Sequence, residues 1–308
     1  MYECAIVGGG IAGLQAAIQL GRYMHRVVVF DTDGGRSVLA KKYSNIIGFE
    51  SGVSGPYLRE TGHRQIQKYE TVELVNERVT EAHRLSDGCF ELQTEDGRTV
   101  QAQRVLLSTG LTDCLPQEIE GLYDVLGSAI YLCPDCDGYE VRGHICAILG
   151  AGDAGAALAC TLHYWTDRLI YINHEPVAKP ISAEWRSRCE QAGIRIYEGK
   201  IQAVHAQNKE DLSAVELADG TRIEAEKGFV AFGGTHVESD LAQMLGVTRH
   251  ENGHIPVDGR TKETNVPGVW AAGDVAVHSQ LLTVAIGDGA QSAIWIHKSL
   301  QDDNRNLF

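Results

Sequence analysis

The sequence lacks the features of a membrane-spanning or secreted protein. No apolar run approaches the ~20 residues that a membrane span needs. The chain enters an apolar strand pattern directly after Met1–Cys4, so no signal peptide is indicated. Its 8 cysteines among 308 residues are too few for a disulfide scaffold. These absences predict a cytoplasmic protein without a membrane partner.

Basic residues are also scarce. The chain has 27 lysines and arginines against 41 aspartates and glutamates, which gives a net charge of −14. That balance disfavours nucleic acid and anionic membrane surfaces as partners. The hydrophobic share of 44% is sufficient for a large core. The length allows two domains of roughly 150 residues each.

Two glycine-rich loops each follow an apolar strand pattern and precede a helix pattern. The first is Gly8–Gly13 and the second is Gly150–Gly155. This spacing is typical of dinucleotide binding, in which glycines allow a tight turn, approach of a pyrophosphate and close helix packing. Asp31 follows the next strand, 18 residues beyond Gly13, where a carboxylate is expected to bind a ribose hydroxyl. The repeated pattern predicts an α/β protein with two dinucleotide-binding units.

A dithiol motif, Cys133-Pro134-Asp135-Cys136-Asp137-Gly138, lies between the two loops. Two cysteines separated by two residues can close a small, reducible disulfide. A zinc site would need a second cysteine or histidine pair of similar spacing, which the sequence lacks, so no metal is predicted. The remaining cysteines are interpreted as isolated buried thiols. They are Cys4, Cys89, Cys114, Cys146, Cys160 and Cys189.

The C-terminal part carries further candidate ligand contacts. The apolar strand in Gly268–Asp274 ends on a carboxylate that can accept hydrogen bonds from a polyol chain. A last helix is predicted to begin at Gly287–Ala290, with its positive end available to a flavin carbonyl. Gly34-Gly35 would let the backbone pass close to a flavin, and Phe308 in the tail is a candidate to cover an isoalloxazine ring.

In the order and spacing of these motifs the chain resembles, over nearly its full length, the low-molecular-weight thioredoxin reductases and related FAD-dependent pyridine nucleotide-disulfide oxidoreductases. The resemblance implies two Rossmann-like, three-layer ββα nucleotide-binding domains. Residues 1–113 and 242–308 would form a discontinuous FAD-binding domain. Residues 114–241 would form an inserted NAD(P)-type domain that carries the dithiol. Members of this family are usually homodimers. The landmarks are Gly8–Gly13, Ser108-Thr109-Gly110, Cys133–Gly138, Gly150–Gly155, Gly268–Asp274 and Gly287–Gly289.

The resemblance also implies roles for individual residues. Cys136 would exchange electrons with the flavin, Cys133 would attack the substrate disulfide, and Asp137 would be the general acid. The implied FAD contacts are Gly8, Gly10, Ile11, Ala12, Gly13, Asp31, Gly35, Thr109, Gly110, Gly273, Asp274, Gln280 and Leu281. The implied second nucleotide site comprises Gly150, Gly152, Asp153, Ala154, Gly155, His174 and Glu175. The implied partner is a thioredoxin-like protein disulfide.

The sequence departs from the family at two places. NADPH-dependent members carry arginines after the second strand of the inserted domain, where this chain has Asn173–Pro176. Glu175, 20 residues beyond Gly155, would repel a 2′-phosphate, which predicts a donor other than NADPH. NADH, a protein donor such as ferredoxin, a second ADP-containing ligand, and a loop used only for packing remain open. The family's arginine before the last helix is absent from Ser279-Gln280-Leu281.

The predicted function is that of an FAD-dependent dithiol–disulfide oxidoreductase acting on a protein disulfide. A flavin thiol oxidase of a small dithiol is an alternative, because the same sulfur chemistry runs backwards when oxygen is the acceptor. A flavin-binding redox sensor that does not turn over is the alternative from outside the enzymes.

Overall fold

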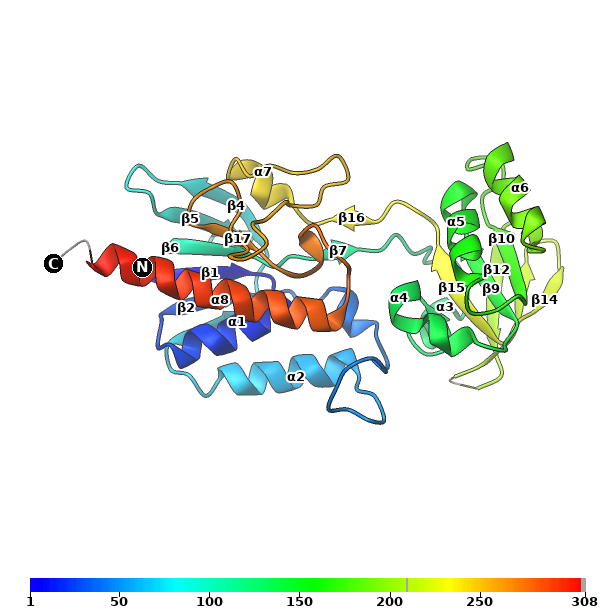
Figure 1. Ribbon diagram of the computed structural model, residues 1–308, viewed down its shortest axis with the longest axis horizontal. Coiled ribbons are helices and arrows are strands. Elements are labelled where there is room, and N and C mark those ends of the chain that lie inside the picture. The colour runs from blue at the N-terminus through cyan, green and yellow to red at the C-terminus, as the bar shows by residue number, and fades with distance from the viewer. Residues whose placement is uncertain (209, 306–308) are drawn as a thin grey trace. The chain divides into compact units, whose positions relative to one another are not determined.

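The structure is a computed structural model that describes residues 1–208 and 210–305 (Figure 1). The predicted role of Phe308 lies outside the described residues. Within the described ranges, no helix has both the length and the apolar character needed to cross a bilayer.

The chain forms two compact units. The first unit comprises residues 1–38, 54–112 and 236–308, and the second comprises residues 39–53 and 113–235. The chain therefore returns to the first unit at residue 236, where the sequence predicted residue 242. It returns there because β16 (His236–Val237) pairs antiparallel with β7 (Leu111–Thr112). Residues 39–53 pack with the second unit. The Leu39 carbonyl oxygen lies so close to Gly127 that a Cβ added at Gly127 would be 2.1 Å from it.

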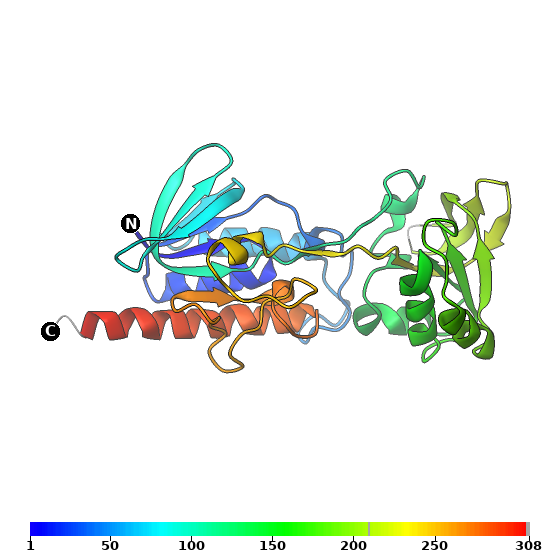
Figure 2. The ribbon, with the colours of Figure 1, turned by 90° about the horizontal axis from the view of Figure 1, so that it is seen from above.

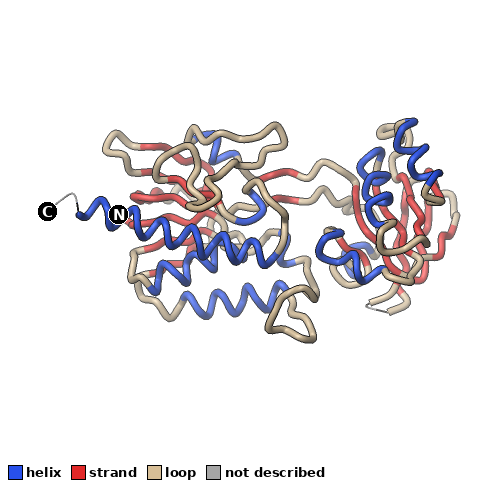
Figure 3. Tube along the Cα trace, in the orientation of Figure 1, coloured by secondary structure: helices blue, strands red, loops and turns tan. Residues whose placement is uncertain are grey.

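The first unit is built on a seven-stranded sheet of order β3-β2-β1-β6-β5-β4, with β17 pairing against β6. The strands of both units are coloured red in Figure 3. Strands β1, β2, β3, β6 and β17 are parallel, and β4 and β5 form an antiparallel hairpin that continues into β6. The strands are β1 Tyr2–Val7, β2 Val27–Phe30, β3 Val72–Val75, β4 Val79–Arg84, β5 Phe90–Thr94, β6 Thr99–Leu107 and β17 Val269–Ala271.

Helices cover one face of this sheet, and the β4–β5 hairpin with α7 (Asp240–Met244) covers the other (Figure 2). Successive strand residues alternate between the two faces. Cys4 and Ile6 pack in the helical core, whereas Ala5 and Val7 pack in the hairpin core. The helices on the first face are α1 Ile11–Arg22, α2 Gly55–Ile66 and α8 Leu282–Arg305.

The second unit has the same layering around a parallel five-stranded sheet of order β11-β10-β9-β15-β8. Helices α5 (Gly152–Leu162) and α6 (Ala183–Gln191) pack on one face, and a three-stranded antiparallel sheet packs on the other. The five parallel strands are β11 Arg195–Glu198, β10 Leu169–Asn173, β9 Cys146–Gly150, β15 Lys227–Ala231 and β8 Ile130–Tyr131. The antiparallel strands are β12 Ile201–Ala206, β13 Leu212–Leu217 and β14 Arg222–Glu224. Short helices α3 (Leu122–Val125), α4 (Pro134–Asp137) and η2 (Gly138–Val141) complete the unit.

The predicted α/β fold class, with two Rossmann-like units, is confirmed. The predicted start of the last helix at Gly287 is wrong, because α8 already begins at Leu282. Gly289 serves helix packing instead of helix initiation, whereas a Cβ at Gly287 would meet nothing within 4 Å. A Cβ added to Gly289 would lie 2.1 Å from the Ala12 carbonyl oxygen, so the absence of a side chain lets α8 approach the first turn of α1. Gly287 therefore does not offer a helix end to a ligand.

Candidate active site

Cys133 and Cys136 are joined as a disulfide at the start of α4, with their Cα atoms 5.2 Å apart. Cys133 caps the helix in an extended conformation, and Pro134 occupies the first turn, where its missing N–H costs nothing. The backbone N–H of Cys136 donates to Cys133 Sγ over 3.2 Å. Because this donor would stabilise negative charge, the geometry favours a thiolate on Cys133 after reduction.

Asp137 ends α4 and is partly buried. Burial, with a smaller contribution from the nearby charge of Glu140, raises the pKa of Asp137 to about 7. The turn that follows is fixed by packing, because a Cβ at Gly138 would lie 2.7 Å from the Trp165 ring. A carboxyl group whose pKa lies close to neutral pH therefore directly follows the disulfide. Asp135, between the two cysteines, is exposed.

The first glycine loop fits a diphosphate-bearing ligand. Gly8 has a φ of +105°, and its added Cβ would lie 2.3 Å from the Ser108 carbonyl oxygen. Gly13 similarly lets α1 approach the Gly8 carbonyl. A Cβ at Gly10 would meet nothing within 4 Å, and Gly10 caps α1 without any side-chain hydrogen bond. The first-turn N–H groups, at Ile11 and Ala12, can therefore receive an anion.

Asp31 follows β2 beside this loop and is held by a buried arginine that the sequence analysis missed. Arg59 of α2 donates to Asp31 Oδ2 over 2.8 Å and to the Gly9 carbonyl over 3.2 Å. The Thr32 N–H donates to Asp31 Oδ1 over 2.9 Å, and His63 Nε2 lies 3.3 Å from Asp31 Oδ2. Arg59 thus fixes the carboxylate against the glycine loop. The helix α2 pattern gave no sign that this arginine is buried.

Three chain segments meet at Arg36, in η1 (Arg36–Val38). Its guanidinium donates to Gln280 Oε1 over 2.7 Å and lies 3.8 Å from Asp274 Oδ2, in η3 (Gly273–Val275). Gln280 Nε2 lies 3.4 Å from His254 Nε2. The candidate contacts Asp274 and Gln280 are therefore brought together by a cation from the loop after β2. Arg36 was not predicted as a site residue, although it directly follows the Gly34-Gly35 pair.

A buried carboxylate, Asp288, supports the end of β17 from α8. It accepts from the Gly273 N–H at 3.2 Å and lies 2.9 Å from Lys262 Nζ and 2.5 Å from His278 Nε2. Burial alone would raise the pKa of Asp288, but the two cationic partners outweigh it and the net pKa is lowered. The same ion pair raises the pKa of His278. Gly287-Asp288-Gly289 was interpreted from the sequence as a helix start and a family landmark, with no role predicted for Asp288 itself.

The other predicted contacts of the first unit lie at strand and loop ends. The Thr109 hydroxyl donates to the Glu238 carbonyl, and the Glu238 N–H donates to the Gly110 carbonyl over 3.0 Å, which anchors the returning chain. Gly35 is exposed with a φ of +92°. Leu281 is partly buried just before α8.

The second glycine loop is largely satisfied by its own unit. The Gly152 N–H donates to Asn173 Oδ1 over 3.0 Å, and the Gly152 carbonyl accepts from the Tyr171 hydroxyl over 2.7 Å. A Cβ at Gly155 would lie 2.4 Å from the Tyr171 ring. Asp153, near the exposed Ala154, accepts from the Ser182 N–H over 2.7 Å. Gly150 packs against the Ala231 carbonyl in the same way. Packing within the unit accounts for most of this motif.

His174 and Glu175, at the end of β10, have different environments. His174 is buried and its Nδ1 accepts from the Ile201 N–H over 2.9 Å, so the imidazole is part of the core. Burial lowers the pKa of His174. Glu175 is partly exposed and pairs with Lys179 at 3.1 Å. Lys179 also donates to the Phe232 carbonyl over 3.3 Å, so this cation is already engaged.

Comparison with known proteins identifies relatives along nearly the whole chain. The model of the family described as pyridine nucleotide-disulphide oxidoreductase matches residues 2–289. A ferredoxin–NADP reductase of Granulibacter bethesdensis is 31% identical, with 99% of this chain and 91% of the relative covered. A probable thioredoxin reductase of Arthroderma benhamiae is 26% identical, with 98% and 81% covered. Among solved structures, the crystal structure of HlmI aligns with a TM-score of 0.86 at 26% identity, covering 99% of this chain and 94% of that chain.

Proposed function

The chain belongs to the pyridine nucleotide-disulphide oxidoreductase family, and we propose that it is an FAD-dependent dithiol–disulfide oxidoreductase that reduces a protein disulfide. Its relatives and structural neighbours include thioredoxin reductases, and the chain is an oxidoreductase of that type. Membership implies FAD and a pyridine nucleotide as cofactors. The observation that carries the proposal is the Cys133–Cys136 disulfide with the partly buried carboxyl of Asp137 directly after it.

The first unit would hold FAD through its glycine loop and the segments around it. Gly8–Gly13 and the first turn of α1 would receive the diphosphate. Asp31, fixed by Arg59, would accept a ribose hydroxyl, and Asp274, near Arg36, would bind the polyol chain. When bound, FAD supplies the electron pair that opens the disulfide.

The sulfur chemistry then belongs to residues of the second unit. Cys133, whose sulfur receives the Cys136 N–H, is the thiolate that attacks an external disulfide and displaces one of its sulfurs. Cys136 next attacks the Cys133 sulfur, which releases the second external thiolate and re-forms the internal disulfide. Asp137 donates a proton to the departing thiolate, because its carboxyl still carries that proton near pH 7.

The electron donor is proposed to be NADH and not NADPH. Glu175 stands where a 2′-phosphate would be bound, and its neighbour Lys179 is engaged by Glu175 and Phe232. A ferredoxin is the alternative donor, since one relative is named a ferredoxin–NADP reductase. The internal hydrogen bonds of Gly152 further predict weak pyrophosphate binding at the second glycine loop.

Anaerobic stopped-flow mixing tests the donor. NADH should bleach the flavin absorbance at least about tenfold faster than NADPH, because the carboxylate repels the additional phosphate. The variant Glu175→Arg should reverse the preference, and Glu184→Arg, which changes the same charge on the exposed face of α6, should not. Rapid, stoichiometric bleaching of the wild type by NADPH would show the donor assignment to be wrong. Bleaching by reduced ferredoxin alone would select the alternative.

Steady-state reduction of thioredoxin disulfide tests the sulfur chemistry. Cys133→Ser should abolish turnover, and Cys114→Ser, at an exposed thiol, should not. Hydrogen peroxide production from small dithiols without thioredoxin turnover would select the thiol oxidase. If the purified protein is yellow from bound flavin but Cys133→Ser leaves electron transfer to every disulfide unchanged, the redox sensor is the better assignment. The proposed homodimer predicts twice the chain mass in light scattering.

A further inference from the structure

Two cysteines that are 29 positions apart in the sequence meet between α5 and α6 of the second unit. Cys160 Sγ on α5 lies 3.8 Å from Cys189 Sγ on α6. Both were predicted from the sequence to be isolated, buried free thiols. Both are free, but Cys160 is partly exposed and the two sulfurs are in contact. A disulfide needs its sulfurs about 2.05 Å apart, so the two atoms must approach by roughly 1.8 Å.

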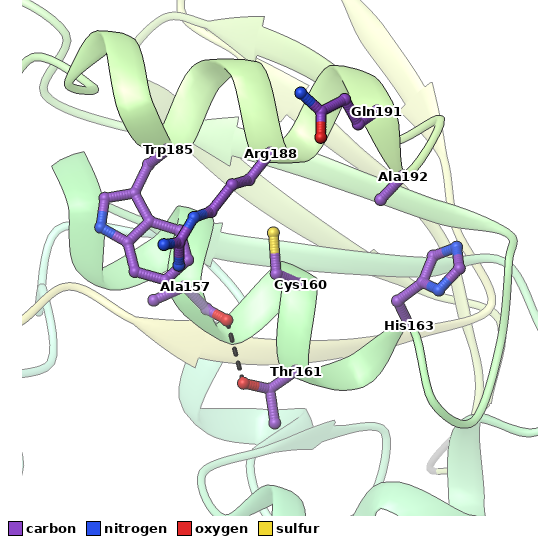
Figure 4. A pocket seen from close by; sticks show the side chains of 8 residues that line it. All are labelled: Ala157, Cys160, Thr161, His163, Trp185, Arg188, Gln191 and Ala192. Carbon is purple, nitrogen blue, oxygen red and sulfur yellow. Dashed lines mark hydrogen bonds between the residues drawn. The ribbon is translucent and has the colours of Figure 1, made fainter.

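The two thiols differ in access. Cys160 is partly exposed and lines a surface groove between α5 and α6, together with His163, Trp185 and Arg188 (Figure 4). Cys189 is fully buried behind it, 3.8 Å from the Ala156 carbonyl oxygen. A small oxidant in the groove therefore meets the Cys160 sulfur first.

The buried thiol is protected until its neighbour reacts. Burial raises the pKa of Cys189 to about 12, and the adjacent Cys160 contributes to the same shift. Cys189 therefore carries its proton at neutral pH and is a poor nucleophile towards external reagents. Oxidation of Cys160 would make Cys189 react, because the oxidised Cys160 sulfur is an electrophile in direct contact with the Cys189 sulfur.

From this arrangement we infer that Cys160 and Cys189 form a second redox couple, separate from Cys133–Cys136, that is oxidised by hydroperoxides. The Cys160 thiolate attacks the peroxide O–O bond, giving a sulfenic acid and one water after protonation. The Cys189 sulfur then attacks the sulfenic sulfur, the S–O bond breaks, and a second water leaves. Two thiols thus lose two electrons to one hydrogen peroxide, and the product is a Cys160–Cys189 disulfide.

The crosslink would join the two helices beside the second glycine loop. Helix α5 begins at Gly152, and its Asp153 already accepts from the N–H of Ser182, the N-cap residue of α6. A covalent bond at Cys160 and Cys189 would fix the opposite end of the same helix pair. This inference does not depend on the electron donor or on the disulfide substrate.

Peptide mapping of the full-length holoenzyme tests the couple. The protein is reduced, desalted, treated with graded hydrogen peroxide, quenched with acid and alkylated after unfolding. Trypsin releases Cys160 in residues 143–168 and Cys189 in residues 189–195. We expect these peptides to appear as a cross-linked pair that lacks two hydrogens. Fragmentation assigns the bond to Cys160 or to the buried Cys146 of the same peptide.

Cys89 supplies the matched control, since it is partly exposed like Cys160 and lies in its own peptide, 85–98. Cys160 should leave the thiol state faster than Cys89. In Cys189→Ala the sulfenic acid should persist, and dimedone should label Cys160 at least about tenfold more than in the wild type. If Cys189→Ala does not fold, the wild-type map alone decides. Oxidation of Cys160 and Cys89 at equal rates, with Cys189 still alkylatable, would overturn the inference.

Discussion

The substitution Asp137→Asn separates the stability of the second unit from the chemistry at its disulfide. Burial raises the pKa of Asp137 from 3.8 to about 7, so the folded state favours the neutral carboxyl. The associated stability is complete below pH 3.8 and is lost as pH rises through about 7. Each unit of pKa shift corresponds to about 1.4 kcal/mol, so the free energy of unfolding falls by roughly 4 kcal/mol in total over this pH range. Asparagine keeps the shape and never ionises, so it avoids this cost.

Urea unfolding followed by circular dichroism, with the disulfide intact, measures the effect at pH 5 and pH 8.5. Linkage predicts that the advantage of asparagine over aspartate grows by roughly 2.5 kcal/mol between these two conditions. Asp135→Asn is the control, because it removes a carboxylate two residues away at an exposed position. Asp135→Asn should change the free energy of unfolding by the same amount at pH 5 and at pH 8.5. An equal free-energy change for Asp137→Asn at pH 5 and pH 8.5 would refute the reasoning.

The same variant should be slower as an enzyme while being more stable in alkali. Loss of a general acid typically costs about 10²- to 10⁴-fold in rate, so turnover with a protein disulfide should fall within that range. The wild-type rate should decline above about pH 7, as Asp137 loses its proton, and the decline should be absent in Asp137→Asn. A wild-type profile unchanged by the substitution would remove Asp137 from the proton transfer.

Three further predictions concern the first unit. Gly289→Ala should release bound flavin and lower the melting temperature, because the new Cβ would lie 2.1 Å from the Ala12 carbonyl oxygen. A variant that keeps its flavin and the wild-type melting temperature would contradict the packing argument. Arg36→Met should weaken flavin retention about tenfold or more, since charge-assisted hydrogen bonds contribute roughly 1.5–3 kcal/mol, whereas Arg22→Met at the end of α1 should not. Asp288→Asn should lower the pKa of His278, measured by NMR. His278 stabilises the wild type below its ordinary pKa of 6.5, and this contribution is lost as pH rises through its raised folded value, so the variant should lose stability mainly at acidic pH.

Much of the architecture could be predicted from local patterns. Apolar strands followed by glycine loops predicted β1 with α1 and β9 with α5, because a strand, a glycine turn and a helix are consecutive in the chain. The Asp-Gly dipeptides at residues 87–88 and 219–220 are typical of tight turns, and they connect the hairpins β4–β5 and β13–β14. Gly289 in α8 contributed to the wrong helix start, since close helix packing and helix ends both favour glycine.

The sequence by itself determined the pairing of Cys133 with Cys136, because only two residues lie between them and the short helix α4 fixes their geometry. Only the tertiary structure decided which distant charges and thiols meet. Arg36 reaches Gln280, Arg59 reaches Asp31, and Cys160 reaches Cys189 across segments that no local pattern connects. The physical reason is that local patterns encode hydrogen bonding and burial within an element. The packing of one element on another sets the neighbours of a side chain, and with them its pKa and its reactivity.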